Sequence, residues 1–406
     1  MRAARPAPSL CVVLACVAVA LAGCGKGAAS GAGPTPKVAP VTPAGAVSVV
    51  TRNTTRLGGA DAATDAAAVA RAVYPGLTSA TRPQLVVLVD SRDWPAALAA
   101  SELAGAPLAA PILYSTGDAL PSVSLEALEA LDPTGAPALA GTQVLRIGTT
   151  AAVPKQYLTR SLPSAPAPEI AATLAQLMGS AGAPARHQAI LLPSGAAPTL
   201  QMPAAGLAAQ SGAPILFATP GRLPAATVAA LTSLRHPAVY VLDAGAVDGF
   251  ALRELAHLGT VTEITGSASG EQAGPSASSI AVARFTDGRF GWGVKEPGHG
   301  LVFASDLKPL DAPAAALLSA TANYGPLLLL EGAHQIPAAL AAYLGDIQPA
   351  YNESFDYRPV RGVYNHGWLI GDANAISAVT QAEIDTLLEI SPSRGSSSEA
   401  SSSQVE

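Results

Sequence analysis

Short polar residues and one Trp follow three apolar runs of the chain, at the points where the runs end. They are Asp90, Ser91, Asp93 and Trp94 after the first run, Ser194 after the second, and Ser305 and Asp306 after the third. Carboxylates and hydroxyls give fixed acceptors for sugar hydroxyls, and an indole offers a surface on which a sugar ring can stack. Asp and Ser also cap helices, and a Trp also packs in cores. The pattern therefore predicts either carbohydrate contacts or helix caps and packing.

The sequence lacks the residue patterns that are typical of catalytic centres. It contains no Gly-x-Ser-x-Gly nucleophile elbow and no paired-carboxylate motif, and its six histidines lack the spacing of a metal site. We therefore expect a noncatalytic protein that binds no cofactor and no metal.

Residues 1–23 have the pattern of an export signal. Arg2 and Arg5 precede an apolar stretch over residues 10–22, and small residues stand just before Cys24. The stretch is shorter than the roughly 20 residues that a spanning helix needs. The two other cysteines lie inside this segment, so the exported chain keeps one thiol and can form no internal disulfide.

The four residues that end at Cys24, Leu-Ala-Gly-Cys, resemble the lipobox of bacterial lipoproteins. This resemblance implies that Cys24 becomes the new N-terminus and carries acyl chains such as palmitate. The protein is then held at the outer face of the membrane, because several acyl chains together give stable anchoring. The alternative is an ordinary secreted protein with a cysteine near its cleavage site.

Composition limits the other classes of function. The chain has 406 residues, of which 49% are hydrophobic and 4% aromatic, so its cores are built from Ala, Val, Leu and Ile. Removal of residues 1–23 changes the net charge from −6 to −8, which opposes nonspecific binding to nucleic acid. Residues 24–46 are typical of a flexible stalk, and residues 392–406 of a disordered Ser-rich tail.

Three segments of the chain repeat one order of strand, helix, strand and helix. From the end of the first apolar run to the Pro that opens the second run, the spacing is 21, 20 and 21 residues. From there to the Pro that opens the next helix it is 10, 10 and 11 residues. We therefore expect three α/β repeats over residues 47–157, 158–261 and 262–391. Their near-continuous apolar strands are typical of small parallel sheets that are covered on both faces.

The repeats resemble the bacterial cell-wall-binding repeat of the second type, which occurs in tandem triplets in envelope proteins of Gram-positive bacteria. The resemblance rests on Arg-Leu-Gly-Gly-Ala-Asp at residues 56–61, Asp-Trp-Pro at 93–95, Pro-Ile-Leu at 111–113 and the later Leu-Pro at 120–121. It extends over residues 53–391. The chain departs from the family at Ala62, Ala63 and Ala96, and the second and third segments keep few of the polar signature residues.

The resemblance implies Rossmann-like, flavodoxin-like repeats in a pseudo-threefold arrangement. It also directs attention to Arg56 and Asp61, which either form a structural pair between repeats or contact an anionic polymer. We therefore expect a lipid-anchored envelope protein whose partner is cell-wall polysaccharide, peptidoglycan or another envelope component, and which binds no nucleic acid. The alternative is a solute-binding lipoprotein that captures a small ligand for transport.

Overall fold

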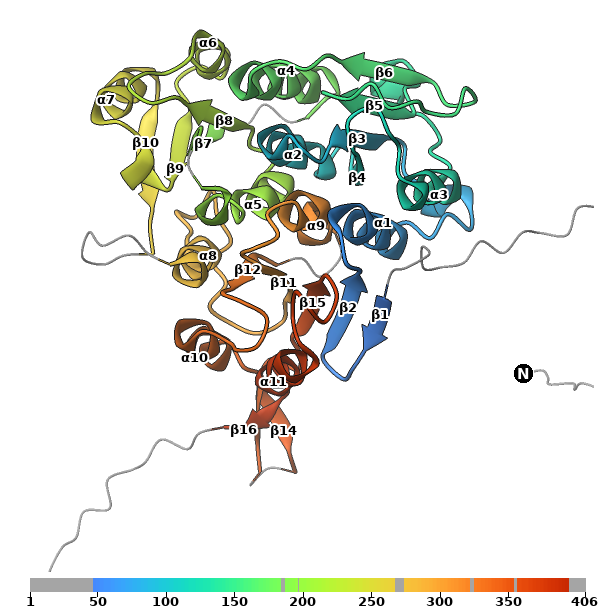
Figure 1. Ribbon diagram of the computed structural model, residues 1–406. Coiled ribbons are helices and arrows are strands. Elements are labelled where there is room, and N and C mark those ends of the chain that lie inside the picture. The colour runs from blue at the N-terminus through green and yellow to red at the C-terminus, as the bar shows by residue number, and fades with distance from the viewer. Residues whose placement is uncertain are drawn as a thin grey trace, which may run out of the picture. The chain divides into compact units, whose positions relative to one another are not determined.

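The computed structural model describes residues 47–183, 187–195, 197–266, 274–321, 325–353 and 356–393. The expected export signal, the stalk with Cys24 and nearly all of the Ser-rich tail lie outside these residues. Within the described part of the chain, no helix is long and apolar enough to cross a bilayer. The described strands form three mostly parallel sheets and a small three-stranded sheet, and helices flank them (Figure 1).

The first sheet has four parallel strands in the order β4-β3-β5-β6. Its strands are β3 (Val86–Asp90), β4 (Ile112–Ser115), β5 (Val144–Ile147) and β6 (Thr159–Leu162). Every residue of β3 and β4 is buried, as their continuous apolar sequence requires. The helices that follow these strands are α2 (Trp94–Ala100), α3 (Ser122–Leu131) and α4 (Ala167–Ser180).

The second sheet repeats this order as β8-β7-β9-β10, again with all strands parallel. Its strands are β7 (Gln188–Pro193), β8 (Ile215–Ala218), β9 (Ala238–Leu242) and β10 (Thr260–Ile264). The accompanying helices are α5 (Ala204–Ser211), α6 (Ala225–Ser233), α7 (Gly249–Leu258) and α8 (Pro275–Arg284).

The third sheet has the order β12-β11-β15-β2-β1, in which β1 alone is antiparallel. Its strands are β11 (Gly300–Ser305), β12 (Leu327–Leu330), β15 (His366–Ile370), β2 (Thr54–Gly58) and β1 (Val47–Val50). The helices are α9 (Asp311–Ala320), α10 (Ala338–Asp346), α11 (Ala378–Leu388) and, after β2, α1 (Ala62–Val73). The small sheet contains β13 (Ala350–Asn352), β14 (Arg358–Arg361) and β16 (Ser391–Pro392).

The opening strand of each segment lies in the sheet of another segment. β6 opens the second segment and lies in the first sheet, and β10 opens the third segment and lies in the second sheet. β2 opens the first segment and pairs with β15 in the third sheet. The helix after each opening strand packs instead on its own segment's sheet, with α1 on β4, α4 on β8 and α8 on β12. Residues 47–58, which we expected in the first repeat, therefore form strands of the third sheet.

The helices that follow β3, β7 and β11, which are α2, α5 and α9, pack against one another. α5 contacts both α9 and η2, the 3₁₀ helix over Ser101–Ala104 that continues α2, and Figure 1 shows α5, α9 and α1 side by side. Their contact faces are built from small residues. A Cβ atom on Gly206 would lie 2.6 Å from the Ser319 Oγ, and one on Gly105 would lie 2.1 Å from the Ala209 carbonyl oxygen. Glycine at these two positions lets the segments approach closely.

The expected class of fold, α/β with several small parallel sheets, is confirmed. The three first strands, β3, β7 and β11, occupy the same position in their sheets, between the second and third strands of the segment. The order is that of flavodoxin-like sheets. The pseudo-threefold arrangement of the repeats stays a prediction.

Candidate functional site

The carboxyl ends of the parallel strands form one polar rim in each sheet. The backbone N–H of Ser91 donates to the Ser115 carbonyl at 2.8 Å, and Ser194 and Asp306 make the corresponding bonds in the second and third sheets at 2.7 and 3.0 Å. Ligands of doubly wound sheets bind at such rims. The residues selected from the sequence therefore lie at equivalent places, but in three different sheets rather than in one site.

An ion pair dominates the first rim. Asp90 ends β3, is 6% exposed and pairs with Arg92 at 2.7 Å. Its carboxylate also accepts hydrogen bonds from the backbone N–H groups of Arg92 and Gly117. The hydrogen bond from the Arg92 side chain lowers the pKa of the Asp90 carboxyl. The Arg92 side chain is 68% exposed, so it presents a guanidinium to solvent in an orientation set by Asp90.

Gly117 makes room for this guanidinium. Its φ is +63°, and a Cβ atom there would lie 2.6 Å from the Arg92 Nη2. A side chain at this position would therefore push Arg92 aside, besides straining the backbone. Sequence reasoning missed Arg92, although its place two residues after a strand-ending Asp could have identified it.

Asp93 and Trp94 have structural roles beside the ion pair. Asp93 caps α2, because its carboxylate accepts from the Ala96 backbone N–H at 3.1 Å, and burial raises its pKa. Trp94 is half-buried and packs against the main hydrophobic core. Ser91 is also half-buried. Asp93 and Trp94 therefore stabilise the start of α2, next to the exposed Arg92.

The second rim is less charged. Ser194 is half-buried and is followed by exposed Gly195. Nearby β9 ends before Asp243, whose pKa is raised by burial.

In the third rim, Ser305 is 2% exposed, and its Oγ accepts from the Leu307 backbone N–H at 3.3 Å. Asp306 is half-buried, and burial raises its pKa. The Ser305 hydroxyl therefore stabilises the turn after β11, a structural role that leaves it little surface for a ligand.

Two buried carboxyls lie beside the third rim. Asp65 on α1 and Asp311 on α9 are both 0% exposed, and burial raises the pKa of each. The Gly59 backbone N–H donates to Asp65 at 2.6 Å, and the Lys308 Nζ lies 3.6 Å from the same carboxyl. The signal in the sequence is a single acidic residue in the first turn of each of two Ala-rich helices.

Arg56 and Asp61 do not form the expected pair. Arg56 is 3% exposed, and burial lowers the pKa of its guanidinium. It donates to the carbonyls of Gly371, Asp372 and Ile376 at 3.0, 2.8 and 2.6 Å, and to the Gln381 side chain at 2.9 Å. Asp61 is instead the N-cap of α1. Arg56 therefore joins β2 to the connection between β15 and α11 and does not face a ligand.

No group of three or more His, Cys, Asp or Glu side chains in the described ranges is arranged to hold a metal ion. Cys24, the expected lipidation site, lies outside the described residues.

The fold resembles solved structures of cell wall proteins. Cwp8 from Clostridium difficile matches with a TM-score of 0.59 at 16% identity, over 83% of this chain and 52% of the Cwp8 chain. Cwp6 from Clostridium difficile gives a TM-score of 0.62 at 15% identity, over 85% of this chain and 51% of the Cwp6 chain. The chain thus spans about half the length of either protein, and identities this low show a shared fold alone. No protein-family model and no curated protein matches the chain.

Proposed function

We propose that the protein is exported, anchored through a lipid on Cys24, and binds a cell-wall glycopolymer without catalysing a reaction on it. The observation that carries the proposal is the fold shared with the cell wall proteins Cwp8 and Cwp6 over 83% and 85% of the chain. The sequence around Cys24 supports the anchor. The protein then acts in the cell envelope, and the rims of its sheets are the surfaces that contact the polymer.

The first rim is the best candidate for the contact. Arg92 offers exposed donors, and Asp93 and Ser91 offer acceptors for hydroxyl groups at the same edge. A guanidinium also binds carboxylate or phosphate groups of a polymer in a defined geometry. The net charge of −8 expected after cleavage opposes general attraction to an anionic polymer. Binding therefore depends on local contacts, and salt weakens it only modestly.

A solute-binding lipoprotein is the alternative, and it would have two lobes with one cleft between them. The shared strand order of the three sheets supports a module of repeated units instead.

Cosedimentation of the full chain with purified wall polysaccharide and with peptidoglycan tests the proposal. We expect saturable binding to one of them, and Arg92→Ala should weaken it by about tenfold, as for the loss of a charge-assisted contact. Arg253→Ala is the matched control, because Arg253 is an exposed arginine on α7, away from the first rim. The proposal is wrong if the wild-type chain binds neither fraction, and the site is wrong if Arg92→Ala binds like the wild type.

A further inference from the structure

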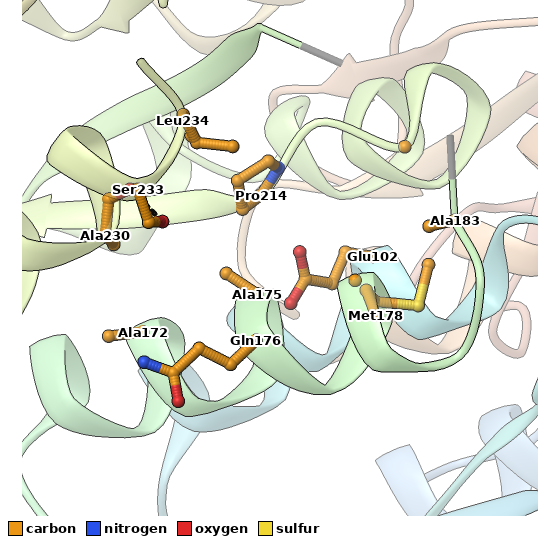
Figure 2. A pocket seen from close by; sticks show the side chains of 12 residues that line it. Glu102, Ala172, Ala175, Gln176, Met178, Ala183, Pro214, Ala230, Ser233 and Leu234 are labelled. Carbon is orange, nitrogen blue, oxygen red and sulfur yellow. Dashed lines mark hydrogen bonds between the residues drawn. The ribbon is translucent and has the colours of Figure 1, made fainter. Parts of the chain in front are cut away.

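A cavity of about 280 Å³ lies between η2, α4 and α6, apart from the rims of the sheets (Figure 2). Its wall is mainly apolar and includes Ala175, Met178 and Pro214. Gln176 and Ser233 also line it and are exposed, so they stand where the cavity meets solvent. This volume is near the lower end of the range for small-molecule sites, about 300–1,000 Å³.

The Glu102 carboxyl points into this cavity, between Pro214 and Ala175 (Figure 2). Glu102 is 1% exposed, and no hydrogen bond or charge from a described residue acts on its carboxyl. Burial raises the pKa of this carboxyl well above its usual range. A buried acid without a partner destabilises a fold, and an apolar residue of similar size would pack here at lower cost. The fold by itself therefore gives no reason for a glutamate at this position.

We propose that the cavity binds a small molecule that combines an apolar body with one ammonium group, and that this group pairs with the Glu102 carboxylate. The apolar wall would bury the body, and the ammonium group would supply the partner that Glu102 lacks. An anionic ligand would be repelled by the carboxylate. A sugar would lose its hydration without finding enough hydrogen-bond partners on this wall.

The site is separate from the wall-binding site proposed above. Trp94 begins α2 at the first rim, whereas Glu102 lies eight residues later, in η2, beyond the opposite end of α2. Ligand binding in the cavity and polymer binding at the rim can therefore be tested independently.

Calorimetric titration of the full chain with benzylamine tests the inference, with benzyl alcohol as the uncharged probe of similar shape. We expect one benzylamine to bind per chain, and benzyl alcohol to bind at least about tenfold more weakly. Glu102→Gln removes the carboxylate, so it should weaken benzylamine binding by about tenfold or more. The side chain keeps its shape, so the melting temperature should stay the same. Glu126→Gln, at an exposed glutamate on α3 that does not line the cavity, should bind like the wild type.

Proton release gives a second measurement. The ligand needs the carboxylate form, so binding should release a proton from Glu102 and strengthen as the pH rises toward the raised pKa. Titrations in buffers of different ionisation enthalpy measure that proton.

Three results would each overturn the inference: no saturable binding of benzylamine, equal binding by Glu102→Gln, or equal binding of benzyl alcohol. If Glu102→Gln does not fold, Ala175→Leu serves instead, because it keeps the carboxyl and fills part of the cavity. Retained benzylamine affinity in Ala175→Leu would also contradict the inference.

Discussion

Replacing Arg56 by alanine should destabilise the fold strongly. The guanidinium is buried and makes four hydrogen bonds of 2.6–3.0 Å, three of them to backbone carbonyls that follow β15. A hydrogen bond to a charged group contributes about 1.5–3 kcal/mol, so the gross loss is about 6–12 kcal/mol. The alanine variant no longer bears the cost of taking a guanidinium out of water, several kcal/mol, which offsets part of that loss. We therefore expect the free energy of unfolding to fall by about 3–5 kcal/mol.

Urea unfolding followed by circular dichroism measures this change, provided that the slope of the transition stays the same. Arg92→Ala is the matched control, because its side chain is 68% exposed and should change stability little. Hydrogen exchange should locate the damage in β2 and β15, which Arg56 helps to join. If Arg56→Ala unfolds within about 1 kcal/mol of the wild type, the hydrogen bonds of this guanidinium do not stabilise the third sheet as we argue.

Three further predictions concern the buried acids, the helix contacts and the anchor. Burial raises the pKa of Asp311 above its ordinary 3.8, so the folded chain holds a proton that the unfolded chain releases. The contribution of the Asp311 carboxyl to the free energy of unfolding is complete below about pH 4. It falls as the pH rises through the raised pKa, by up to about 1.4 kcal/mol per pH unit. Asp311→Asn should flatten this fall in urea titrations at several pH values, and an unchanged dependence on pH would contradict the assignment. Gly105→Ala should lower stability by about 1–3 kcal/mol, because its Cβ would meet the Ala209 carbonyl. Gly179→Ala should leave stability unchanged, because a Cβ atom at this position of α4 would stand in open space. Equal melting temperatures of the Gly105→Ala and Gly179→Ala variants would refute the close-contact argument. The full chain should partition into detergent and Cys24→Ala into the aqueous phase; partition of both into water would exclude the anchor.

The sequence alone determined most of the local structure. The first of the three apolar runs, which ends at Asp90, forms β3 (Val86–Asp90). Pro121, Pro224 and Pro337 each stand immediately before a helix, as the repeat spacing indicated. These features depend on residues close to one another in the chain, through apolar periodicity and the backbone limits of proline, so a single sequence contains them.

Only the tertiary structure decided which sheet each opening strand joins. The backbone groups that pair β2 with β15 are the same in every strand, so the side chains of β2 do not specify a partner about 310 residues away. That pairing buries Arg56, which the sequence alone left open as a polymer contact. It also brings α1 against α9, where Asp65 and Asp311 meet. The local sequence thus determines the units, whereas long-range contacts between the segments determine how the units interlock.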